Sequence, residues 1–149
     1  MKKILTAVLI LILFALQSKS QILAPVSWSY AAKKTGKTEA VLFIKATIDK
    51  GWHVYSQFVK EGGPVKTTIT FAPSASYALA GRTVEPKPIT RMEKAFNMEV
   101  GFFETSVIFQ QKVKLKAGQV TVKGSLEYMT CNDQKCLPPD HIEFEIPVR

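Results

Sequence analysis

Residues 40–49 read AVLFIKATID, a stretch in which every second residue from Ala40 to Ile48 is apolar. The intervening residues are mixed and include Lys45 and Thr47. Side chains of a β-strand point alternately to its two faces, so this period of two predicts a long strand with one apolar face. The same pattern recurs along the chain on both sides of this stretch.

Alternating segments are expected at residues 26–31, 52–57, 67–71, 77–84, 102–115, 120–128 and 142–148. Glycines and prolines, such as Gly62-Gly63-Pro64, separate them and indicate turns. From Ile89 to Met98 the alternation fails, and we expect a long connecting loop. No window has the period of an amphipathic helix. Seven to nine short strands predict an all-β fold, an immunoglobulin-like antiparallel β-sandwich.

Residues 1–20 have the features of a cleaved signal peptide. A basic start is followed by an apolar run from Ile4 to Leu16, and then by the small residues Ser18 and Ser20 before Gln21. The apolar run is too short to span a bilayer comfortably. We therefore expect residues 21–149 to be a single exported, periplasmic domain that does not span the membrane after cleavage. Export would place its cysteines where disulfides form and persist.

The charge distribution argues against some function classes. The formal net charge of +8 falls to +5 without Lys2, Lys3 and Lys19, and the other lysines are spread along the chain with acidic residues between them. Nucleic-acid binding needs clustered basic residues, so we expect no nucleic-acid partner. The sequence also has no nucleophile elbow, phosphate loop or paired catalytic carboxylates, which leaves nothing to indicate a hydrolase or a kinase.

Cys131 and Cys136 are the only cysteines, and four residues separate them. A disulfide that closes so short a loop contributes on the order of 2 kcal/mol, about half of what a bridge between distant strands gives. Close pairs suit thiol–disulfide exchange, because one thiolate attacks and the other resolves the mixed disulfide. Many close pairs are nonetheless inert loop clips, and the spacing alone leaves both interpretations open.

Metal binding is the competing chemistry. Cys131, Cys136, His53 and His141 could together offer four zinc ligands, but His53 is remote in sequence and the spacing matches no common zinc motif. The scattered methionines do not amount to a copper site. We expect no metal and no other cofactor. His53 is expected to be structural, and Asp133 to form the turn of the cysteine loop by bonding to its own backbone.

Several stretches match a known family in order along most of the chain. They are Gly51–Ser56, Gly63-Pro64, Thr67–Phe71, Phe96 and residues 128–139, YMTCNDQKCLPP. Together they resemble the N-terminal periplasmic domain of the thiol:disulfide interchange protein DsbD. The resemblance implies the same immunoglobulin-like sandwich that the alternation predicts. The spacing of the cysteines is one residue shorter here than in the best-known member, and Lys94-Ala95 replace acidic residues before Phe96.

The resemblance also implies roles for individual residues. Cys136 would form mixed disulfides and Cys131 would resolve them. Phe96 would cap the disulfide, and Tyr128 would form a wall of the site. A thioredoxin-like protein or domain would donate electrons, and oxidised periplasmic proteins would accept them. The expected function is thus that of a thiol–disulfide oxidoreductase acting as a redox carrier. The alternative is an exported β-sandwich binding module whose disulfide is only structural.

Overall fold

The computed structural model describes residues 23–149, and the predicted signal peptide lies outside this range. The described residues form eleven β-strands, and none of their segments is a helix that could cross a membrane. The strands are β1 (Val26–Lys34), β2 (Glu39–Ile48), β3 (His53–Tyr55), β4 (Thr68–Phe71), β5 (Tyr77–Val84), β6 (Ile89–Glu93), β7 (Met98–Phe103), β8 (Ser106–Leu115), β9 (Val120–Tyr128), β10 (Thr130–Cys131) and β11 (Asp140–Val148).

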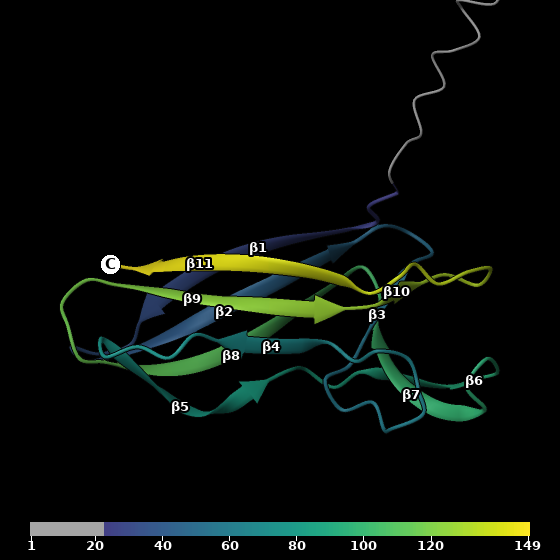
Figure 1. Cartoon of the computed structure of the whole chain (residues 1–149), viewed down its shortest axis with the longest axis horizontal. Coiled ribbons are helices and arrows are strands. Elements are labelled where there is room, and N and C mark those ends of the chain that lie inside the picture. Colours follow the sequence, from purple (N-terminus) through teal and green to yellow (C-terminus); the bar gives the residue numbers. More distant parts are fainter. Residues whose placement is uncertain (1–22) are drawn as a thin grey trace, which may run out of the picture.

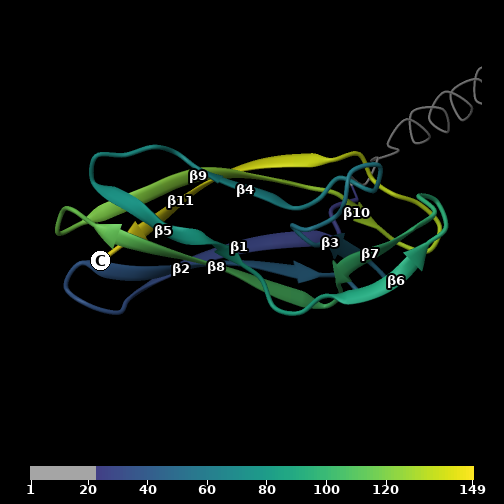
Figure 2. The same cartoon turned by 90° about the horizontal axis from the view of Figure 1, so that it is seen from below.

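Two antiparallel sheets pack face to face. One has the order β1-β2-β8-β5 and the other the order β11-β9-β4. Figure 2 shows them as two layers, with β9 and β4 above β1, β2 and β8. The predicted antiparallel sandwich is confirmed, although its strands are more numerous than expected.

The core lies between these layers, and β2 is central to it. Ala40, Leu42, Ile44, Ala46 and Ile48 are each at most 5% exposed, as the alternation predicted. They lie beside the inner side chains of the neighbouring strand β8 and pack against those of β9 and β11 in the opposite sheet. Each large apolar side chain buried in this way contributes roughly 1.5–3 kcal/mol.

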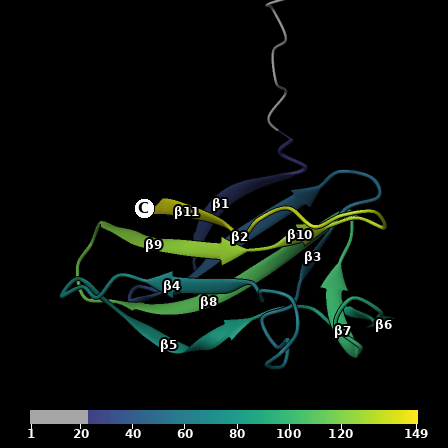
Figure 3. The ribbon, with the colours of Figure 1, turned by 45° about the vertical axis from the view of Figure 1, so that its right-hand side comes forward.

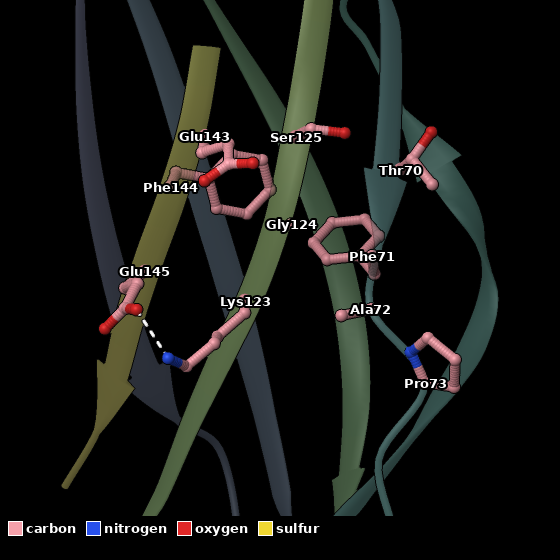
Figure 4. Close-up of a pocket in the computed structure, with 10 residues that line it drawn as sticks. All are labelled: Thr70, Phe71, Ala72, Pro73, Lys123, Gly124, Ser125, Glu143, Phe144 and Glu145. Atoms are coloured by element: carbon pink, nitrogen blue, oxygen red, sulfur yellow. Dashed lines mark hydrogen bonds and ion pairs between the residues drawn. The ribbon is translucent and has the colours of Figure 1, made fainter.

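A glycine in the middle of β9 lets two aromatic rings pack closely. Gly124 is paired with Phe71 of β4 on one side and with Phe144 of β11 on the other. Figure 4 shows both rings beside β9 at this point, in a groove that also carries the Lys123–Glu145 ion pair, at 2.6 Å. A Cβ atom at Gly124 would lie 2.4 Å from the Thr70 carbonyl oxygen and 2.5 Å from Cζ of Phe144. A side chain at this position would therefore force β4 or the ring of Phe144 to shift.

A third sheet, with the order β10-β3-β7-β6, lies at one end of the sandwich (Figures 1 and 3). Its β6 and β7 form a hairpin over Ile89–Phe103, so the prediction of a long loop from Ile89 to Met98 is wrong. The reason is that β6 is an edge strand of this sheet whose half-buried positions include Arg91 and Glu93. An edge strand with charged side chains on its inner face has no apolar alternation to detect.

The expected single strand over residues 102–115 is also wrong, because it is divided between two sheets. β7 ends at Phe103, in the small sheet, and β8 begins at Ser106, in the sandwich. Thr105 between them has a positive φ of 64°, which turns the chain. Apolar alternation continues across the break because both halves bury their inner faces.

Candidate functional site

Cys131 and Cys136 form a disulfide with their Cα atoms 4.0 Å apart, and it closes the loop between β10 and β11. The Leu137 amide donates a hydrogen bond to the Thr130 carbonyl oxygen at 2.9 Å, which closes the base of the loop. The Asn132 side chain accepts hydrogen bonds from the amides of Gln134 and Lys135, each at 2.9 Å. Asn132 therefore forms this turn, and the assignment of that role to Asp133 is wrong.

The two sulfur atoms differ in their environments. Cys131 is 2% exposed and packs in a small cluster with Tyr55, Val100 and Phe102, apart from the main core. Cys136 lies beyond the end of β10 and is exposed. Exchange requires that an incoming thiolate or disulfide reach one sulfur atom. In this structure that atom is Cys136.

A buried polar pair lies behind the disulfide. His53 of β3 stands opposite Cys131 in the antiparallel register and is 2% exposed. Its Nε2 is 3.2 Å from the hydroxyl oxygen of Tyr55. The imidazole also contacts the ring of Phe102, with 5.0 Å between centroids. The Thr130 hydroxyl donates to the His53 carbonyl oxygen at 2.9 Å, which fixes β10 against β3.

Burial shifts the pKa values of both members of this pair. The pKa of His53 is lowered to about 4, mainly by desolvation and further by the Arg91 cation, while Asp133 opposes the shift. The pKa of Tyr55 is raised to about 12, again mainly by desolvation and further by Glu93. Both side chains are therefore neutral at neutral pH.

Arg91 connects the β6–β7 hairpin to the cysteine loop. Its guanidinium lies 4.5 Å from the centroid of the Phe102 ring. It forms ion pairs with Glu93 at 3.6 Å and with Asp133 at 4.0 Å. Because the Asp133 side chain is exposed, the pair with it contributes at most about 1 kcal/mol. The contact therefore links the hairpin to the loop only weakly.

The two other predicted site residues lie in different surroundings. Phe96 is half-buried in the four-residue turn between β6 and β7. Figure 3 shows the hairpin of β6 and β7 at the same end of the molecule as β10. Tyr128 ends β9 and is buried in the main core, where its ring contacts Trp28 at 5.1 Å. Its hydroxyl donates to Asp140 at 3.1 Å. The roles of cap and site wall stay predictions.

Sequence reasoning missed the surroundings of Cys131. His53 and Tyr55 were part of a matching stretch, but only the pairing of β3 with β10 brings them to the disulfide. Arg91 gave no signal, because it lies in the segment expected to be a loop. Among residues 23–149, no group of three or more histidine, cysteine, aspartate or glutamate side chains is placed to hold a metal ion.

The family model described as "Thiol:disulfide interchange protein DsbD, N-terminal" matches residues 19–147. The chain belongs to this DsbD N-terminal family. The resemblance found in the sequence is thereby confirmed. No curated protein sequence matches the chain.

Two solved structures share the fold. The reduced N-terminal domain of DsbD from Neisseria meningitidis is 16% identical, with a TM-score of 0.54, and the match covers 87% of this chain and 93% of that one. The N-terminal periplasmic domain of ScsB from Proteus mirabilis is 17% identical, with a TM-score of 0.54, over 85% of this chain and 49% of that one. The predicted immunoglobulin-like sandwich is thus confirmed.

The lowered pKa of His53 predicts a pH dependence of stability. An unfolded histidine has a pKa near 6.5, so between pH 6.5 and 4 the unfolded chain binds more protons than the folded one. The free energy of unfolding should therefore fall as the pH falls through this range, by on the order of 3 kcal/mol from His53 alone. Urea denaturation at pH 7 and pH 4.5 measures the loss.

The exposed His141 provides the control for this experiment. His53→Gln should remove most of the difference between the two pH values, whereas His141→Gln should leave it as in the wild type. An unchanged pH dependence in the His53→Gln variant would contradict the assignment of this effect to burial of the imidazole.

Proposed function

We propose that this protein is a periplasmic thiol–disulfide exchange protein. It passes reducing equivalents from a thioredoxin-like donor to oxidised exported proteins through the Cys131–Cys136 pair. The observation that carries the proposal is the asymmetry of the pair, in which an exposed Cys136 is bonded to a buried Cys131 in a member of the DsbD N-terminal family. Residues 21–149 are the exported domain that remains after removal of the signal peptide.

Exchange proceeds in two steps. In the reduced protein the Cys136 thiolate attacks a disulfide of the acceptor, which forms a mixed disulfide and releases one acceptor thiolate. The Cys131 thiolate then attacks Cys136, which restores the Cys131–Cys136 bond and releases the second acceptor thiolate. Two electrons pass to the acceptor. The same two steps in reverse, with a reduced thioredoxin-like donor, reduce the Cys131–Cys136 disulfide again.

Protein partners of this kind have support among the structural neighbours. One neighbour is the complex between the DsbD N-terminal and the PilB N-terminal domains of Neisseria meningitidis. It is 16% identical to this chain, with a TM-score of 0.55, over 85% of this chain and 88% of that one. We extend the binding of a protein partner to the present chain and place it at the end of the sandwich that carries the cysteine loop, with Phe96 as the cap and Tyr128 as a wall of the site.

The reduction potential tests the proposal against a purely structural disulfide. A carrier must have a potential near those of its partners, about −120 to −270 mV, whereas inert disulfides in exported proteins lie below about −300 mV. We expect a value in the first range, measured by equilibration with glutathione or dithiothreitol buffers and alkylation of free thiols. A reduction potential below about −300 mV would contradict the carrier function and favour the alternative, a binding module with a structural disulfide.

A further inference from the structure

His53 is a buried titratable side chain that the exchange mechanism leaves without a role. It stands directly opposite Cys131 in the antiparallel pairing of β3 with β10. Directly opposed residues of antiparallel strands project to the same face, with Cβ atoms about 4.5–5.5 Å apart. The imidazole therefore lies beside the Cys131 side chain, and each residue is only 2% exposed.

Cys131 needs a proton acceptor to act as a resolving thiol. The thiolate is the nucleophile in exchange, and burial in apolar surroundings raises the pKa of a thiol. Cys131 packs against Tyr55, Val100 and Phe102, away from solvent water that could take its proton. A base within the protein would lower this barrier, and the imidazole of His53 lies next to the thiol.

We propose that His53 is the base that accepts the thiol proton of Cys131 when Cys131 resolves a mixed disulfide at Cys136; this inference rests on the proposed exchange function. The Cys131 S–H bond breaks and its proton passes to the imidazole. The Cys131–Cys136 bond forms and the bond from Cys136 to the partner sulfur breaks. The partner thiolate leaves with both bonding electrons, and the imidazolium then releases its proton to that thiolate or to solvent.

The surroundings of His53 suit this role. The charged and titratable groups around the imidazole are Tyr55 on its own strand, Arg91 and Glu93 on β6, Asp133 in the cysteine loop, and Cys131. Tyr55 orients the ring through the 3.2 Å hydrogen bond. The imidazole is neutral at neutral pH, which is the form that accepts a proton, although its lowered pKa makes it a weaker base than a free histidine. A thiolate forming on Cys131 would favour the imidazolium, so the two titrations are coupled.

The test uses the purified, reduced protein and one equivalent of 5,5′-dithiobis(2-nitrobenzoic acid). The first coloured thiolate is released when Cys136 attacks the reagent, and the second when Cys131 resolves the mixed disulfide. His53→Gln should slow the second release by at least about tenfold, since general bases contribute about a hundredfold or more. The first release should be unchanged. In His141→Gln, the matched control, both rates should equal those of the wild type.

The pH profile supplies a measurement that needs no variant. If His53 is the base, the second release in the wild type has a constant rate between the pKa of His53, about 4, and that of the Cys131 thiol. Without such a base, the rate rises about tenfold per pH unit, because only free thiolate reacts. We expect the constant rate in the wild type and the rising rate in His53→Gln.

Two results would overturn the role of His53. One is that folded His53→Gln releases the second thiolate at the wild-type rate. The other is that the rate of the second release in the wild type rises with pH, a result that holds even if the variant does not fold. Failure of the exchange function is a separate result. It would appear as a His53-dependent reaction with the small reagent and no mixed disulfide with any thioredoxin-like protein.

Discussion

Cys131→Ala should accumulate a mixed disulfide with an oxidised thioredoxin-like protein, and Cys136→Ala should not. In the proposed mechanism the exposed Cys136 attacks the partner, and in Cys131→Ala no second thiol remains to resolve the product. In Cys136→Ala the remaining thiol is 2% exposed, so a partner protein cannot approach it. We expect a difference of at least about tenfold in the trapped fraction. Non-reducing electrophoresis followed by mass spectrometry of the cross-linked peptide measures it.

The variant that lacks both cysteines is the control for non-covalent association. Equal trapping by the two single variants would contradict the assignment of Cys136 as the attacking thiol. A Cys131→Ala variant that reacts with a small disulfide reagent and ignores thioredoxin-like proteins would contradict the exchange function itself. It would favour the structural-disulfide alternative.

Gly124→Ala should destabilise the fold by about 3 kcal/mol, the upper end of the usual cost of overpacking. The added Cβ would meet the Thr70 carbonyl oxygen at 2.4 Å and Cζ of Phe144 at 2.5 Å. Neither atom is free to move. Thr70 belongs to β4, which is paired with β9, and the ring of Phe144 packs between Phe71 and Tyr30. Urea denaturation at neutral pH measures the loss of stability.

Gly118→Ala is the matched control, because no atom lies within 4 Å of a Cβ at that position. We expect its stability to stay within about 0.5 kcal/mol of the wild type. Equal denaturation midpoints for the two variants would show that β4 and β11 adjust to the added methyl group. A folded Gly124→Ala/Cys131→Ala protein should trap partners through Cys136 as Cys131→Ala does, because Gly124 lies in the sandwich rather than in the small sheet.

The amino-acid sequence by itself determined the sandwich. Ala40 to Ile48 alternate because a sheet that covers a core on one side needs apolar side chains at every second position. The cysteine pair and the surrounding motif were equally visible, because each depends on residues that are close together in the chain. The resemblance of the chain to the DsbD N-terminal family rested on these local features.

Only the tertiary structure decided what surrounds the disulfide. The hairpin of β6 and β7 was invisible because an edge strand with Arg91 and Glu93 on its inner face lacks apolar alternation. The meeting of His53 with Cys131 joins two strands that are far apart in sequence, and nothing in either strand encodes the register between them. Local periodicity indicates which face of a strand is buried, whereas the packing of the whole chain determines which strand it pairs with.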